Sequence, residues 1–177
     1  MVALVSRTGR DLQRYNKGRR QVVGCIPYRY RVTSQTPIGD EEKLEVLVIT
    51  SQREGKGMLF PKGGWEADES IVDAALRETE EEAGVVGTLE RTLGKWCFKS
   101  KTQDEYYEGH MFPLLVQEEL DFWPEKDIRQ RIWMTATEAR EVCQHWWMKE
   151  ALDKLVRRLT SVAKREEEEV VGPCSLS

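Results

Sequence analysis

Apolar residues in this chain gather in short runs, and the lengths of these runs and the residues that flank them predict a series of strands. QVVGCI (21–26) ends before Pro27, and LEVLVI (44–49) is apolar enough to be covered on both faces of a sheet. MLFPKGGW (58–65) predicts a short strand that leads into a Pro/Gly loop. Further strands are expected in three later segments, 86–98, 106–117 and 131–134.

Apolar spacing typical of helices marks three segments. The first follows Asp68 or Ser70, either of which can cap it, and ends at Ala83, just before Gly84. The other two are a short helix and a long amphipathic one, at about 136–143 and from Trp146 to about Lys164.

Strands interleaved with a few helices predict an α/β domain in which a mixed sheet has helices on both faces. We place this domain at residues 18–150, closed by the last helix. A basic segment (1–17), loosely ordered over residues 1–16, is expected before it, and an acidic, flexible tail (165–177) after it.

The composition narrows the class of protein. Forty per cent apolar and 33% charged residues are typical of a globular domain. No apolar run approaches the roughly 18 residues that span a bilayer, so no membrane partner is expected. The four cysteines lie far apart, and with only two histidines we expect reduced thiols and no zinc site.

Charge is distributed unevenly along the chain. Residues 1–31 carry eight Arg or Lys and one acid, a net charge of +7, which leaves −11 on the remainder because the whole chain is −4. A basic segment on an acidic body favours a small polyanionic ligand over general nucleic-acid binding. A solvated tail and an Arg-rich organellar leader are the alternatives.

Four glutamates crowd the end of the first helix, in RETEEEAG (77–84), where the helix dipole disfavours negative charge. At 100° per residue, Glu78, Glu81 and Glu82 share an arc of roughly 100°, whereas Glu80 points to solvent. The neighbouring arc, expected to face the sheet, carries Val72, Leu76, Thr79 and Ala83. The three acids therefore border the buried face.

Repulsion among these carboxylates costs about 0.2–0.5 kcal/mol per pair on an exposed helix and more where the dielectric falls. A solvated charged face is one interpretation. We favour a divalent cation, because no Lys or Arg lies four residues after Glu78, and oxygen ligands suit Mg²⁺. Gly63 and Gly64 let the backbone approach a ligand, although a plain turn would also explain them. An ion pair between Glu69 and Arg77 is expected to lock this loop onto the helix.

Together these positions resemble the Nudix box of the Nudix hydrolases, G-x5-E-x7-R-E-U-x-E-E-x-G-U, where U is a bulky aliphatic residue. The match occupies residues 63–85, with Thr79 at the first aliphatic position. TSQR (50–53) and FPKGGWE (60–66) are most similar to the branch that hydrolyses diphosphoinositol polyphosphates and diadenosine polyphosphates. The similarity extends over roughly residues 18–150.

The resemblance implies a Nudix-type α/β/α sandwich with a mixed β-sheet, in which the box forms a loop–helix–loop that holds Mg²⁺, or alternatively Mn²⁺. It implies that Glu78 and Glu82 bind the metal with the backbone carbonyl of Lys62, and that Glu81 is the general base. Glu69 and Arg77 would support the box. The substrate-binding residues that it implies are Arg10, Lys17, Arg19, Arg20, Ser51, Gln52, Arg53, Gly63, Gly64, Lys101 and Arg131. The chain departs from the branch at Trp146, near which the branch has a lysine.

The activity implied is metal-dependent hydrolysis of phosphoanhydride bonds in such polyphosphates, by a monomer that needs no nucleic acid. Hydrolysis of a smaller nucleoside diphosphate derivative, such as ADP-ribose or capped RNA, is one alternative. Trp65, Trp96 and Phe98 could then stack a base, although we favour packing for them. A catalytically silent Nudix-fold binding module is another alternative. The expected location is the cytoplasm or nucleus, with mitochondrial import through the Arg-rich N-terminal segment as the alternative.

Overall fold

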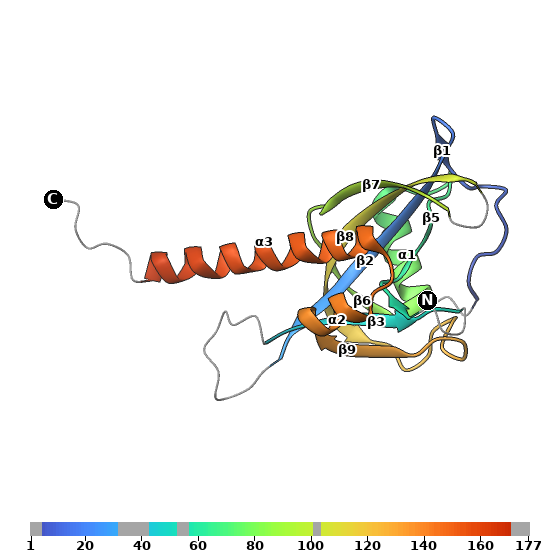
Figure 1. The fold of residues 1–177 in the computed structure, drawn as a ribbon. Helices are drawn as coiled ribbons and strands as arrows, with labels where there is room; N and C mark the ends of the chain where they lie inside the picture. The colour runs from blue at the N-terminus through green and yellow to red at the C-terminus, as the bar shows by residue number, and fades with distance from the viewer. Residues whose placement is uncertain (1–4, 32–42, 53–56, 101–103, 171–177) are drawn as a thin grey trace.

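The computed structural model describes residues 5–31, 43–52, 57–100 and 104–170, with side chains described as far as residue 161. A mixed β-sheet with the strand order β4-β3-β2-β8-β6 forms its centre (Figure 1). β2 and β8 pair in parallel, and the other pairs are antiparallel: β1, β3 and β5 with β2, β4 and β9 with β3, and β6 and β7 with β8. The strands are β1 (Tyr15–Asn16), β2 (Arg19–Tyr30), β3 (Leu44–Thr50), β4 (Met58–Leu59), β5 (Lys62–Gly64), β6 (Val85–Leu89), β7 (Gly94–Lys99), β8 (Tyr106–Glu119) and β9 (Arg131–Thr135).

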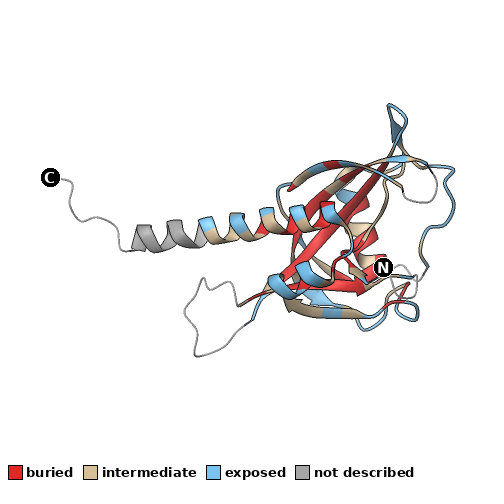
Figure 2. Cartoon of the chain, viewed as in Figure 1, coloured by how far each residue is buried: buried red, intermediate tan, exposed pale blue. Residues whose placement is uncertain are grey.

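Helices cover both faces of the sheet. On one side lies α1 (Ile71–Ala83), and on the other lie α2 (Ala136–Val142) and α3 (Trp146–Val170) (Figure 1). The Trp147 ring of α3 stacks on Phe98 of β7, with 4.6 Å between the ring centroids. Buried residues fill the strands and the inner sides of the helices (Figure 2). The expected α/β/α sandwich with a mixed sheet is confirmed.

Local sequence sets the ends of α1. Ser70, rather than Asp68, is the N-cap, and its hydroxyl accepts a hydrogen bond from the backbone N–H of Asp73 at 3.1 Å. Gly84 ends the helix in the left-handed conformation, with φ of 63°, which glycine adopts without strain.

Three element boundaries differ from expectation. β2 was expected to end before Pro27 but continues beyond it. Pro27 is paired with Leu114 of β8, and the pairing of β2 with β3 begins at the next residue, Tyr28. The expected strand 86–98 is divided into β6 and β7 before Gly94, whose φ of 134° favours glycine. α3 continues six residues beyond Lys164, so part of the expected tail is helical; its glutamates are good helix formers.

The described part of the N-terminal segment (residues 5–16), expected to be loosely ordered, instead packs along the loop that precedes α1. The backbone N–H of Ala67 donates to the Leu12 carbonyl at 2.7 Å, and that of Arg14 donates to the Trp65 carbonyl at 2.9 Å. Polar contacts with the loop therefore order this segment. Among the helices of the described chain, none is both long and apolar enough to cross a bilayer.

Candidate active site

Glu69 and Arg77 join the loop to α1. Nε and Nη2 of Arg77 donate to the two carboxylate oxygens of Glu69 at 2.9 and 2.6 Å, and Nη2 also donates to the Gly64 carbonyl at 3.0 Å. Although burial opposes ionisation, the hydrogen bonds from Arg77 hold the pKa of Glu69 below its ordinary value. The expected ion pair is present, and it fixes the loop against the helix.

The three clustered acids of α1 are buried. Glu78, Glu81 and Glu82 expose 8%, 4% and 6% of their surfaces. Burial raises the pKa of all three carboxyls, and for Glu78, where the charge of Glu82 adds to burial, the pKa rises to about 8. These are the properties of carboxylates that lack a sufficient positive partner.

Neighbouring groups relieve part of this repulsion. One oxygen of Glu82 accepts from the backbone N–H of Lys62 at 2.9 Å, and the other faces Arg129 Nη2 at 3.3 Å. Glu78 accepts from Arg77 Nη1 at 2.9 Å. Arg77 directly precedes Glu78 in the sequence, and its contact with Glu78 was missed because only cations four residues after Glu78 were considered.

The helix is rotated slightly from the expected orientation. Val72, expected to face the sheet, is 44% exposed, whereas Ala74 and Ala75 are fully buried. The prediction for Val72 was wrong because two alanines let the helix approach the sheet closely along their side, where Cys25 Sγ lies 3.5 Å from the Ala75 carbonyl.

A divalent cation fits the chemistry between the loop and the helix. Gly63 lies so close to Glu78 that a Cβ built on it would be 2.1 Å from the carboxylate, so only glycine lets the loop backbone and this acid meet. The donors gathered here are hard oxygens, and a cation would stabilise the ionised forms that burial disfavours. Within the described chain, no three His, Cys, Asp or Glu side chains are arranged to hold a metal by themselves. Mg²⁺ commonly binds through one or two carboxylates and keeps water and phosphate ligands.

Two residues of the segment between β8 and β9 complete the site. Arg129 is 9% exposed, and its Nε donates to Glu125 at 2.9 Å while its Nη2 faces Glu82. The backbone N–H of Glu125 donates to the Glu81 carbonyl at 3.0 Å. Sequence reasoning missed both, because their segment has no regular pattern and its only signal was an acid four residues before a base.

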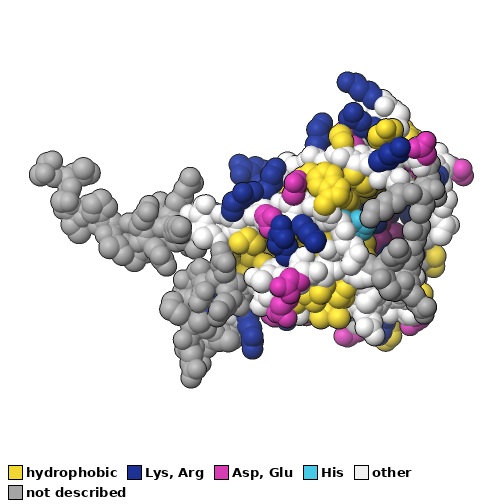
Figure 3. All heavy atoms as spheres, in the orientation of Figure 1, with side chains coloured by type: hydrophobic (Ala, Val, Ile, Leu, Met, Phe, Trp, Pro, Cys, Tyr) yellow, Lys and Arg dark blue, Asp and Glu magenta, His cyan; other side chains and the backbone are white. Residues whose placement is uncertain are grey.

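Arg20 lies beside the loop at the base of the β1–β2 hairpin. Its Nε donates to Gln13 Oε1 at 3.0 Å, and a Cβ built on Gly64 would lie 3.2 Å from its Nη2. Lys17 occupies the hairpin turn with φ of 51°. Basic side chains gather around this end of the molecule (Figure 3).

Two further arginines assigned to substrate, Arg19 and Arg10, contact acids. Arg19 Nη1 lies 3.4 Å from Glu108, and Arg10 Nη1 lies 3.4 Å from Glu105. Both are partly exposed, with 44% and 46% of their side chains accessible. An anionic ligand would therefore compete with these two carboxylates.

Of the residues of TSQR assigned to substrate, two are described and contact other parts of the chain. Gln52 donates to Glu125 at 3.2 Å, and the backbone N–H of Ser51 donates to the Gly57 carbonyl at 3.2 Å. Arg53 and Lys101 lie outside the described residues.

Arg131, also assigned to substrate, lies at the C-terminal end of α1. Its Nη1 donates to the carbonyls of Ala83 and Gly84 at 3.1 and 2.9 Å, and its Nη2 donates to the Leu120 carbonyl at 2.8 Å. Its guanidinium also lies over the Trp123 ring, 4.0 Å from the centroid. Arg131 thus donates to carbonyls at the C-terminal end of α1, where a cation complements the helix dipole, and its role in substrate binding stays a prediction.

The three aromatics considered for base stacking are engaged in packing. Trp65 Nε1 donates to the Glu69 carbonyl at 3.0 Å, and Trp96 Nε1 donates to Glu150 at 2.7 Å. Phe98 is stacked between aromatic neighbours. This agrees with the interpretation that we favoured.

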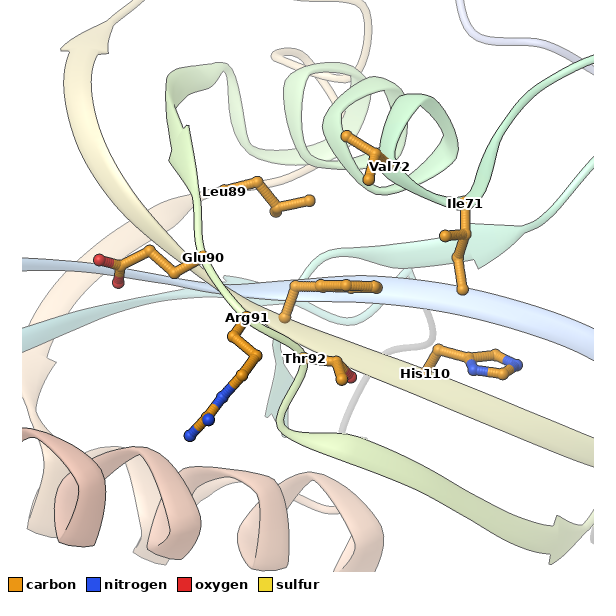
Figure 4. A pocket seen from close by; sticks show the side chains of 8 residues that line it. Ile71, Val72, Leu89, Glu90, Arg91, Thr92 and His110 are labelled. Atoms are coloured by element: carbon orange, nitrogen blue, oxygen red, sulfur yellow. The ribbon is translucent and has the colours of Figure 1, made fainter.

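A cavity of about 500 Å³ lies away from the acids (Figure 4). Its walls include Ile71 and Val72 in the first turn of α1, whereas the acids occupy the last turns of that helix. The remaining walls are Leu89, Glu90, Arg91, Thr92, His110 and Phe112. The cavity is therefore not part of the acidic site.

Residues 29–159 match the NUDIX domain, and the chain belongs to the Nudix family. It is a Nudix hydrolase, an enzyme that acts on phosphoanhydrides. Among its relatives, Nudix hydrolase 18, mitochondrial, of Arabidopsis thaliana is 63% identical over 169 residues, which cover 96% of this chain and 94% of that protein.

More distant relatives include diphosphoinositol polyphosphate phosphohydrolase 3-alpha of Mus musculus. It is 37% identical over 106 residues, which cover 59% of this chain and 63% of that protein. Among solved structures, a binary complex of the C. elegans Ap4A hydrolase superposes with a TM-score of 0.59, covering 80% of this chain and 98% of that one. Its sequence identity of 18% supports the shared fold alone.

Proposed function

We propose that this hydrolase is metal-dependent and cleaves the phosphoanhydride bonds of diphosphoinositol polyphosphates and diadenosine polyphosphates. The observation that carries the proposal is the position of Arg20 at Gly64, one residue after Gly63, which meets the Glu78 carboxylate. Cations suited to remote phosphates and acids suited to a metal thus converge on one loop. The mouse relative, whose name states diphosphoinositol polyphosphates, supports that part of the proposal.

The roles that we propose for these residues are those implied by the resemblance to the Nudix box. Glu78, Glu82 and the carbonyl of Lys62 would hold Mg²⁺ or Mn²⁺, which when bound neutralises phosphate oxygens and lowers the pKa of a water ligand. Glu81 takes the proton from the attacking water as general base. Arginines suit the remaining phosphates because the planar guanidinium binds two oxygens at once.

We also propose that the chain works in mitochondria. Nudix hydrolase 18 carries that location in its name and matches nearly the whole chain. This favours the mitochondrial alternative over the cytoplasmic or nuclear expectation. We further propose that the enzyme acts as a monomer on a small substrate.

The test is phosphate release from inositol pyrophosphates, diadenosine penta- and hexaphosphate and ADP-ribose, each with Mg²⁺ and with a chelator. We expect Mg²⁺-dependent turnover that favours the first two classes. Preference for ADP-ribose would replace the proposed substrate class, and no turnover on any substrate would indicate a silent binding module.

A paired substitution tests the basic surface. Arg19→Ala with Arg20→Ala should raise the KM for inositol pyrophosphates by roughly tenfold or more, because two charge-assisted contacts to phosphate are lost. Arg29→Ala is the matched control, since Arg29 lies at the other end of β2, 3.1 Å from Glu45. An unchanged KM in the double variant would remove both residues from substrate binding.

A further inference from the structure

We propose that Gln13 is a positioning residue of the active site. It holds β5, which carries the backbone expected to bind the metal, and it orients Arg20 toward the substrate. This inference deepens the proposed function and rests on it for the role of Arg20. The placement of the loop by Gln13 follows from contacts alone.

The side-chain amide of Gln13 joins three segments of the chain. Its Nε2 donates to the carbonyls of Arg14 and Gln21 at 2.9 Å each and lies 3.3 Å from the Trp65 carbonyl. Gln21 is in β2, and Trp65 directly follows β5. One amide group therefore fastens the N-terminal segment both to β2 and to the loop that follows β5.

The amide oxygen of Gln13 serves a separate purpose. It accepts a hydrogen bond from Arg20 Nε at 3.0 Å. Because Nε is occupied, the guanidinium is held at a fixed angle beside Gly64. Glutamine suits this position because it supplies both donors and an acceptor, whereas glutamate supplies only acceptors.

The two glycines of β5 show why this position matters. A Cβ built on Gly64 would lie 2.0 Å from Gln13 Oε1, and one built on Gly63 would lie 2.1 Å from the Glu78 carboxylate. Successive residues of a strand face opposite sides. The strand is therefore clamped between the metal-site acid on one side and the Gln13 amide on the other, and neither side leaves room for a methyl group.

Arg14 reinforces the clamp from the next position. Its Nη2 lies 3.3 Å from each of the carbonyls of Glu66, Ala67 and Glu69, and its guanidinium lies over the Trp65 ring, 4.3 Å from the centroid. Gln13 thus contacts the loop at Trp65, and Arg14 contacts it at the residues that follow, Glu66 to Glu69. This pattern indicates that the segment positions the loop and does more than cover it.

The experiment measures hydrogen–deuterium exchange of residues 62–65 and, separately, kcat and KM. In Gln13→Ala, exchange at 62–65 should accelerate roughly tenfold relative to that of β8, because the contacts from its amide are lost. The KM for a diadenosine polyphosphate should rise more than kcat falls. Gln117→Ala is the control, since Gln117 bonds Thr88 Oγ1 at 2.8 Å, away from the loop, and it should match the parent in both measurements.

A second variant separates the two halves of the amide. Gln13→Glu keeps the acceptor for Arg20 and loses the donors, so exchange at 62–65 should accelerate while KM stays nearer that of the parent. Unchanged exchange in both variants, or acceleration spread evenly over the sheet, would overturn the proposal. If the parent hydrolyses no polyphosphate, the proposed function fails, but the exchange data still decide whether Gln13 holds the loop.

Discussion

The carboxylate of Glu81 differs from its neighbours in its contacts. Glu82 is tied to the loop backbone at Lys62, whereas the Glu81 oxygens face the backbone N–H of Arg7 and Arg77 Nη1, each at 3.4 Å. These long contacts leave Glu81 able to accept a proton. Glu81→Gln should therefore lower kcat by roughly several hundred-fold while Mg²⁺ affinity, measured by calorimetry, stays largely unchanged.

Two substitutions on the same helix make this test specific. Glu82→Gln should weaken Mg²⁺ binding, and Glu80→Gln, one residue before Glu81 and partly exposed, should leave both quantities near those of the parent. Full turnover in Glu81→Gln would exclude Glu81 as the base and transfer the role to another group.

His110 links pH to the stability of the loop region. Its Nε2 lies 2.8 Å from Gln21 Oε1, and its ring meets the edge of Trp65 at a centroid distance of 5.9 Å. Burial lowers the pKa of His110, so the folded state favours the neutral ring more than the unfolded chain does. That stabilisation is present above the ordinary histidine pKa and is lost as the pH falls from there through the lower pKa of the folded state.

We therefore expect the change in the free energy of unfolding from pH 7.5 to 5.5 to be more destabilising in the parent protein than in His110→Gln, because the raised pKa values of the α1 carboxyls affect both proteins alike. Urea unfolding at both pH values measures it. Equal changes would show that His110 does not contribute to the pH dependence in this range.

The secondary-structure elements show where sequence reasoning succeeds. The end of α1 at Gly84 and the place of its acids beside the buried face followed from the glycine and from the helical angle between glutamates, whereas the cap was left open between Asp68 and Ser70 and the burial of the acids was not predicted. The face that meets the sheet followed in part, because Thr79 and Ala83 are buried as expected, but Val72 is exposed and Ala74 and Ala75, which gave a weaker hydrophobic signal, are buried in its place. A helix approaches its sheet most closely where its side chains are small, and the spacing of apolar residues carries no information about side-chain size.

Because Gly63 and Gly64 of β5 face opposite sides, we expect alanine at these two positions to have different effects. Gly63→Ala would place a methyl group against the Glu78 carboxylate and should weaken Mg²⁺ binding strongly. Gly64→Ala would meet the ends of Gln13 and Arg20 and should raise the KM with less effect on the metal. Calorimetry with Mg²⁺ and steady-state kinetics distinguish the two, and identical profiles would contradict the opposed faces described for this strand.

Across the entire chain, the site is assembled from segments that sequence spacing does not connect. Arg129 reaches Glu82 from 47 residues away, and Arg131, two positions later, turns to the end of α1 instead. The conformation of the segment before β9 decides which arginine meets the acids. The family motif located the box, but only the fold could choose between these two residues.

The N-terminal segment shows the same limit. The positive charge of this segment was evident from the sequence. Its ordered conformation was not, because it depends on hydrogen bonds from Gln13 and Arg14 to carbonyls of a distant loop, and such bonds produce no periodic pattern in the sequence. A solvated tail is excluded for the described part. An organellar leader is compatible with this packing only if cleavage spares the residues that contact the loop.

Because residues from Ser6 to Arg14 contact the rest of the site, we expect any cleavage in mitochondria to leave these contacts in place. A protein that lacks residues 1–5 retains Ser6, whose hydroxyl lies 3.2 Å from Glu125, and all contacts of Gln13, so it should keep its activity. A protein that lacks residues 1–16 loses the clamp on β5 together with Arg10, and its kcat/KM should fall at least roughly tenfold. N-terminal sequencing after import into isolated mitochondria should accordingly find a processed chain that begins before Gln13. A mature chain that begins after Arg14 and is fully active would show that the loop keeps its shape without the segment packed along it.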